Sequence, residues 1–150
     1  MKREKDLRVI GLDYGTKTVG VAISDEMKLI AQPLVTIERK QANKLRQTYA
    51  AIEQIIAQQD VELIVLGYPK NMNNTEGERV EATKEFKEAL ERRTGLEVVL
   101  IDERLTTVEA NRILEDTGVA LSARKEHIDK MAAAIILQNY LDMEYNKKNS

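Results

Sequence analysis

The sequence predicts an α/β fold in which helices flank both faces of a five-stranded mixed β-sheet. Three β-rich runs follow one another in the first third of the chain, and strand-like and helical segments alternate after them. Consecutive strands favour antiparallel pairing, whereas strands separated by helices favour parallel pairing. The length of 150 residues is typical of one domain, so we expect a single domain over residues 1–150 with a flexible tail at about 146–150.

The first three strands are predicted from β-rich runs separated by turn residues. Residues 7–13 and 18–24 flank a short turn at Gly15 and Lys17, which is typical of an antiparallel hairpin. Residues 29–38 form the third run, and Pro33 within it indicates an edge strand or a bulge, because proline cannot donate a ladder hydrogen bond.

The rest of the chain reads as alternating helices and buried strands. Apolar residues recur at helical spacing in two segments, and two short apolar runs fit buried parallel strands. A capping box opens a third helix, and a fourth ends the fold. The predicted elements are a helix at 42–58, a strand at 62–67, a loop at 68–77, a helix at 78–94, a strand at 96–102, and helices at 106–116 and 125–143.

Composition excludes several classes of protein. The chain has no cysteine, which rules out disulfides, thiolate zinc sites and cysteine nucleophiles. It has no apolar run of membrane-spanning length and no apolar signal region, so we expect a cytoplasmic protein without membrane contact. Its formal charge is −2, so a nucleic-acid partner would require a local basic surface and cations near its own carboxylates.

Acidic residues stand at three positions where functional groups collect. Asp13 ends the first strand, and the pair Asp102 and Glu103 ends the last strand, where open α/β sheets place their sites. Successive strand residues point to opposite faces, so only one member of the pair is expected in a common site. Asp129 lies on a helix face whose small residues would allow close approach to the sheet. Taken singly, each acid also fits an ordinary turn or helix-start role.

Together the three acids predict a divalent metal site. Carboxylate oxygens without cysteine or clustered histidine suit Mg²⁺ or Mn²⁺, and two such ions support in-line phosphoryl displacement. His127 alone cannot form a zinc site. We therefore assign Asp13, Glu103 and Asp129 as catalytic metal ligands, with the choice between Asp102 and Glu103 left open.

Polar and basic residues supply candidate contacts to a phosphate backbone. The loop after the fourth strand carries amides and a lysine suited to holding phosphates. The candidate substrate-binding residues are Lys70, Asn71, Asn73, Arg104 and Lys17. Further basic candidates, which could equally be solvated surface residues, are Arg39, Lys40, Lys44, Arg46, Arg124, Lys125 and Lys130.

Four motifs resemble the YqgF family, namely residues 10–15, 67–72, 102–107 and 128–133, in the same order and at similar spacing. The most specific string is Asp-Glu-Arg-Leu-Thr-Thr at 102–107. The resemblance implies a ribonuclease H-like fold, cytoplasmic location and a role in maturing the 5′ end of 16S rRNA precursor. The family's acids fall on Asp13, Glu103 and Asp129.

Alternative functions remain open at this point. The first hypothesis is a metal-dependent nuclease acting on precursor rRNA. The second is a Holliday junction resolvase acting on branched DNA, which needs a homodimer because two symmetric cuts need two sites. The third is a non-catalytic RNA-binding factor in ribosome assembly, and the fourth, an actin-type ATPase, would need two such domains. Both a monomer and a homodimer are compatible with the sequence.

Overall fold

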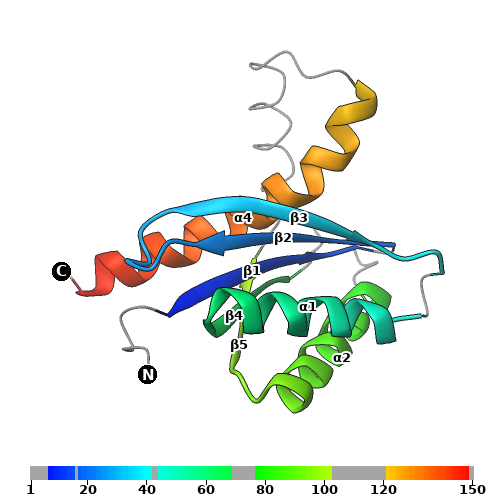
Figure 1. Cartoon of the computed structure of the whole chain (residues 1–150), viewed down its shortest axis with the longest axis horizontal. Helices are drawn as coiled ribbons and strands as arrows, with labels where there is room; N and C mark the ends of the chain where they lie inside the picture. Colours follow the sequence, from blue (N-terminus) through cyan, green and yellow to red (C-terminus); the bar gives the residue numbers. More distant parts are fainter. Residues whose placement is uncertain (1–6, 16, 42–43, 69–76, 103–120, 149–150) are drawn as a thin grey trace.

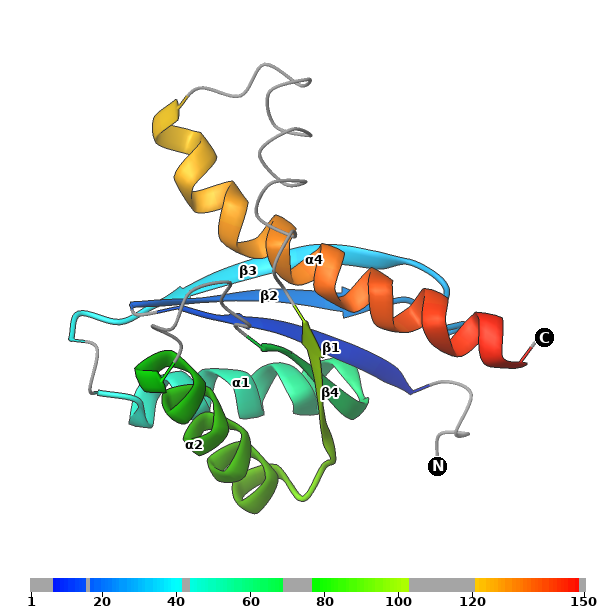
Figure 2. The ribbon, with the colours of Figure 1, turned by 180° about the vertical axis from the view of Figure 1, so that it is seen from behind.

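The fold is a five-stranded sheet with helices on both of its faces (Figures 1 and 2). The computed structural model describes residues 7–15, 17–41, 44–68, 77–102 and 121–148. The strands are β1 (Arg8–Tyr14), β2 (Thr18–Ser24), β3 (Ala31–Glu38), β4 (Val61–Tyr68) and β5 (Val98–Asp102). The helices are α1 (Arg46–Gln59), α2 (Gly77–Thr94) and α4 (Leu121–Lys148).

The sheet is mixed, as predicted. Its strand order is β3-β2-β1-β4-β5, and β2 is antiparallel to both β1 and β3, whereas β4 is parallel to both β1 and β5. The proline prediction is confirmed in both its forms, because β3 lies at the edge and the β2–β3 register shifts between Val21 and Ala22, the residue that pairs with Pro33.

Each face of the sheet has its own apolar core. On one face, α1 and α2 bring Ile52, Phe86 and Leu90 against strand residues such as Ile10 and Leu12, all of them buried. On the other face, α4 packs its alanines and its larger apolar side chains against β1, β2 and β4. The two layers are visible on opposite sides of the sheet in Figures 1 and 2. The alternation of strand residues between the two cores fixes which face each side chain enters.

Some boundaries differ from the predicted ones for local reasons. The third strand begins at Ala31 rather than residue 29, because the Leu29 and Ile30 amides donate to Asp25 Oδ1 at 2.8 and 3.0 Å and so belong to the turn. The predicted start of the first helix at 42 is also wrong, since α1 begins at Arg46.

The final helix extends beyond the predicted range at both ends. It was expected over 125–143 with a tail from 146, but α4 runs from Leu121 to Lys148. Three of the residues assigned to the tail are therefore helical. The helix predicted at 106–116 and most of the loop at 68–77 lie outside the described residues.

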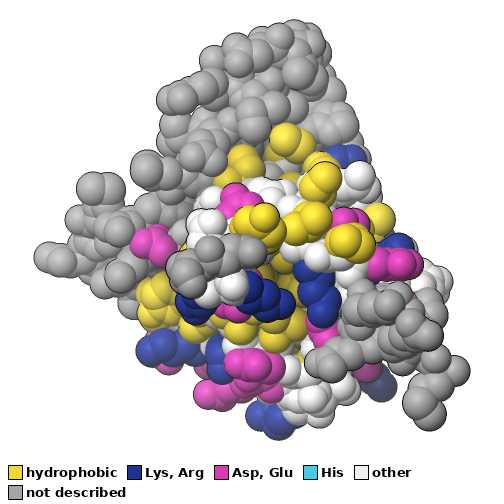
Figure 3. Space-filling model, turned by 90° about the vertical axis from the view of Figure 1, so that its left-hand side faces the viewer, with side chains coloured by type: hydrophobic (Ala, Val, Ile, Leu, Met, Phe, Trp, Pro, Cys, Tyr) yellow, Lys and Arg dark blue, Asp and Glu magenta, His cyan; other side chains and the backbone are white. Residues whose placement is uncertain are grey.

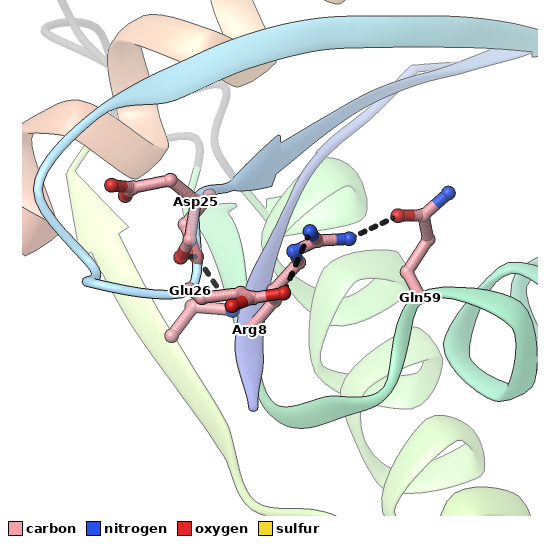
Figure 4. A network of polar contacts seen from close by, with 6 residues as sticks. Arg8, Asp25, Glu26 and Gln59 are labelled. Atoms are coloured by element: carbon pink, nitrogen blue, oxygen red, sulfur yellow. Dashed lines mark hydrogen bonds and ion pairs between the residues drawn. The ribbon is translucent and has the colours of Figure 1, made fainter. Parts of the chain in front are cut away.

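A polar network holds together the end of the sheet where β1 begins (Figure 4). Arg8 donates through Nη1 to Gln59 Oε1 at 2.8 Å and pairs through Nη2 with Glu26 at 3.4 Å, which connects β1 to α1 and to the β2–β3 turn. Figure 3 looks at this end of the molecule, where charges of both signs are mixed with exposed hydrophobic side chains. Among the described residues in this view neither sign of charge predominates, and Asp13 lies near the opposite end of β1.

Candidate active site at the carboxyl end of β1

Asp13 lies at the carboxyl end of β1, on the sheet face that α4 covers. Ile10, Leu12 and Tyr14 contribute to the core under α1 and α2, whereas Val9 contributes to the core under α4. Because strand side chains alternate, Asp13 belongs to the α4 face. Its side chain is partly buried, and it pairs in register with Gly20 of the neighbouring β2.

Asp129 is brought to this position by a very close approach of α4 to β2. A Cβ added to Gly20 would overlap the backbone carbonyl group of Asp129 and would lie 3.0 Å from the backbone nitrogen of Lys130. Only glycine leaves room for the helix backbone there. Since Gly20 is the register partner of Asp13, the helix turn that carries Asp129 lies directly beside Asp13.

A second small residue permits the same approach one strand away. A Cβ added to Gly11 on β1 would lie 2.7 Å from Leu137 Cβ and 3.0 Å from the carbonyl oxygen of Ala133. Ala132 and Ala133 are fully buried, which confirms that the small face of this helix packs on the sheet. Gly11 and Gly20 thus provide, on the sheet, the space into which the small face of α4 packs. Sequence reasoning missed this role, although the alternation of small residues on β1 and β2 could have indicated it.

The third predicted acid lies outside the described residues, but its neighbour is informative. Leu100 packs against the core under α1 and α2, and Ile101 packs against the core under α4. Asp102 therefore lies on the α1 and α2 face, opposite to Asp13, and it is exposed. Among the residues that the structure describes, no group of three acidic or histidine side chains is placed to hold a metal ion.

Stacked aromatic side chains pack next to the β1–β2 turn, on the sheet face that α1 and α2 cover. Phe86 of α2 stacks on Tyr14 with ring centroids 4.1 Å apart and on Tyr49 of α1 at 5.4 Å. The Arg39 and Arg93 guanidinium carbons lie 5.1 Å from the ring centroids of Tyr14 and Tyr49 respectively. Burial raises the pKa of Tyr49, with the nearby Tyr14 acting in the same direction, so the phenol stays neutral.

Arg39 has a structural role that differs from the predicted one. The sequence offers it as a substrate contact, but its side chain is buried, and Nη2 donates to the Gly15 carbonyl at 2.8 Å. Its backbone amide donates to the Lys17 carbonyl at 2.7 Å. Arg39 thereby holds the turn that follows Asp13.

The other predicted substrate contacts are only partly described. Lys17 is exposed on the β1–β2 turn, close along the chain to Asp13. Lys130 follows Asp129 on α4 and is partly buried. Four predicted contacts, together with the predicted ligand Glu103, lie outside the described residues: Lys70, Asn71, Asn73 and Arg104.

The fold matches that of RuvC. Two Thermus thermophilus RuvC structures, one of them in complex with a Holliday junction substrate, align with TM-scores of 0.59 and 0.57 at 14% and 13% identity. Each alignment covers 93% of this chain and at least 96% of the other. At this identity the likeness shows the fold, which is the ribonuclease H-like architecture expected from the sequence.

The sequence comparisons identify the family. The family model described as "RuvX: Holliday junction resolvase" matches residues 7–143. A relative from Agathobacter rectalis is 58% identical, and the alignment covers 95% of this chain and 100% of the relative. A relative from Lachnospira eligens is 60% identical, and the alignment covers 91% of this chain and 97% of the relative. Both are named "Putative pre-16S rRNA nuclease". The chain belongs to the RuvX family, also called YqgF, which confirms the resemblance seen in its motifs.

Proposed function

We propose that this chain is a metal-dependent nuclease that cleaves phosphodiester bonds at the 5′ end of pre-16S rRNA in the cytoplasm. The observation that carries the proposal is the contact between α4 and β2, where the Asp129 backbone packs on Gly20, the register partner of Asp13. The backbone segments that carry Asp13 and Asp129, which are distant along the chain, thus meet at one corner of the sheet. The names of the close relatives supply the substrate.

The residue types of this corner fit a hard divalent cation. Asp13 and Asp129 offer only oxygen ligands, and the chain has no cysteine. Mg²⁺ or Mn²⁺ held there would activate a water molecule and stabilise the leaving oxygen. Lys17, exposed on the adjacent turn, would hold a phosphate of the substrate.

The face on which Asp102 lies argues against Asp102 as the third ligand. Asp102 lies on the face opposite to Asp13, and a ligand on that face could not share a cation with Asp13. Glu103 is therefore proposed to complete the set with Asp13 and Asp129, and Lys70, Asn71, Asn73 and Arg104 stay proposed as substrate contacts.

The test is a set of charge-removing variants assayed on precursor RNA. Asp13→Asn and Asp129→Asn are each expected to lower Mg²⁺-dependent cleavage by at least about 10³-fold and to weaken Mn²⁺ binding in isothermal titration. Asp102→Asn is the matched control, since it removes the same charge from the opposite face and should keep activity. Full activity of Asp13→Asn with retained Mn²⁺ binding would reject the proposed mechanism.

A four-way DNA junction in the same assays tests the second candidate function, which the description of the family model favours. Two symmetric cuts would require a homodimer, so sedimentation with and without the junction separates the two substrates. Junction cleavage by a dimer, with no cleavage of precursor RNA, would replace the RNA proposal. Retained RNA binding without any Mn²⁺ binding would instead support a non-catalytic role in ribosome assembly.

A further inference from the structure

A basic pocket lies at the same end of the sheet as Asp13, between the end of β3 and the start of α1. Its volume is about 530 Å³, within the range of small-ligand sites. Its lining contains Arg39, Lys40, Lys44 and Arg46, with Glu38 as its one acid. The chain as a whole carries a formal charge of −2, so this concentration of positive charge departs from the average of the molecule.

The cations at the pocket are available to a ligand. Lys40, Lys44 and Arg46 are exposed, and within the part of the chain that the structure describes none of them forms an ion pair. Clustered exposed cations attract polyanions. Phosphate groups, which accept several hydrogen bonds from such donors, are the ligand chemistry that this lining fits.

The start of α1 adds backbone donors to the same pocket. Leu45 precedes the helix and provides no side-chain cap, and the first turn of α1 holds no acidic residue. The first amides of a helix lack intrahelical partners and carry the positive end of its dipole. Gln47 and the buried Thr48 of this turn line the pocket, so the helix start faces the same space as the lysines.

The pocket is connected to the proposed active site through Arg39. The backbone of Arg39 bonds to Lys17, and its guanidinium bonds to Gly15, at 2.7 and 2.8 Å. β3 is two strands from β1, which corresponds to about 10 Å at ordinary strand spacing. The pocket lies on the side of the sheet that α1 covers, whereas Asp13 lies on the α4 side. A polynucleotide bound near Asp13 could cross the turn at Lys17 and place another phosphate in the pocket.

We infer that the pocket formed by Lys40, Lys44, Arg46 and the start of α1 binds a backbone phosphate of single-stranded RNA on the same strand as the cleaved bond. The inference rests on the proposed nuclease function for its substrate, but it concerns residues separate from the metal ligands. It assigns Lys40, Lys44 and Arg46 a role in holding the RNA strand, whereas Asp13 and Asp129 act on the bond itself.

The experiment measures RNA binding in EDTA, so that it does not depend on cleavage. A fluorescein-labelled single-stranded RNA spanning the 5′ boundary of 16S rRNA is titrated with the full chain, and its anisotropy is followed between about 50 and 200 mM salt. The double variant Lys40→Gln/Lys44→Gln is compared with Lys147→Gln/Lys148→Gln, which removes the same charge from the last turn of α4.

The pocket variant is expected to raise Kd about tenfold and to reduce the slope of log K against log salt by about 1. The α4 variant is expected to stay within about twofold of the parent protein. Equal effects of the two double variants would overturn the inference, because the loss would then reflect net charge alone.

Two further measurements separate the sources of phosphate and the two proposals. If ATP or inorganic phosphate binds in a Lys40- and Lys44-dependent manner while RNA binding is unchanged, the pocket serves a free anion and the RNA inference fails. Pocket-dependent RNA binding without any Asp13-dependent cleavage supports the pocket and rejects the nuclease. Asp13-dependent cleavage with RNA binding that does not depend on the pocket supports the nuclease and rejects the pocket.

Discussion

Replacing Gly20 by alanine tests the contact on which the active-site geometry depends. The added Cβ would overlap the Asp129 carbonyl oxygen, and the neighbouring atoms are also backbone, so no flexible side chain can move away. The two backbones must separate by more than about 1 Å before the contact becomes ordinary. Displacing a packed helix by that distance belongs to the upper end of overpacking costs, about 3 kcal/mol.

The same displacement would change the position of Asp129 relative to Asp13. A misplacement of about 1 Å can cost about 10²-fold in rate where geometry is decisive. We therefore expect Gly20→Ala to lower the free energy of unfolding by about 3 kcal/mol in urea titrations. Among the molecules that remain folded, Mg²⁺-dependent cleavage should fall about 10²-fold, and Mn²⁺ binding should weaken.

Gly11→Ala is the matched control because the added methyl group would contact the same helix at Leu137 and Ala133, further along α4 from Asp129. Its Cβ would lie 2.7 Å from Leu137 Cβ, so a shift of about 0.7 Å restores an ordinary 3.4 Å contact. We expect about 1–2 kcal/mol of destabilisation and a much smaller effect on Mn²⁺ binding. If Gly20→Ala unfolds at the same urea concentration as the parent and cleaves equally well, α4 does not approach β2 as described and the argument for the site fails.

Two other predictions concern stability. Phe86→Ala removes the middle ring of the stack between Tyr14 and Tyr49 and should cost about 3–5 kcal/mol, lowering the melting temperature by about 10 °C; a change below about 1 kcal/mol would contradict its central packing role. Burial raises the pKa of Asp25, but the Ile30 and Leu29 amides outweigh it, so the folded pKa lies below 3.8. The stability that Asp25 contributes is thus present above its unfolded pKa and is lost as pH falls through the folded value. Asp25→Asn should flatten the decline in stability between about pH 5 and 3, and an unchanged acid profile in thermal melts would contradict this.

The sequence alone was sufficient to identify the family, because short local motifs distinguish it. The strings around Asp13, at 102–107 and around Asp129 stand in fixed order, and the strand and helix periods were sufficient to predict a mixed sheet with helices on both faces. Pro33 predicted an edge strand or a bulge because proline lacks the amide that a ladder requires, and the structure has both an edge position and a register shift there. Such properties depend on neighbours along the chain, and the sequence therefore determines them directly.

The spatial relation of the acids required the tertiary structure. The period of two says that Asp102 and Glu103 face opposite ways, but only the packing of Leu100 and Ile101 against different cores decides which way Asp102 faces. The sequence suggested that Arg39 is a surface cation, but its side chain is buried and donates a hydrogen bond to the Gly15 carbonyl of the β1–β2 turn. Exposure, register and the close approach at Gly20 arise from contacts between distant segments, and these depend on how whole elements pack rather than on the order of residues within any one of them.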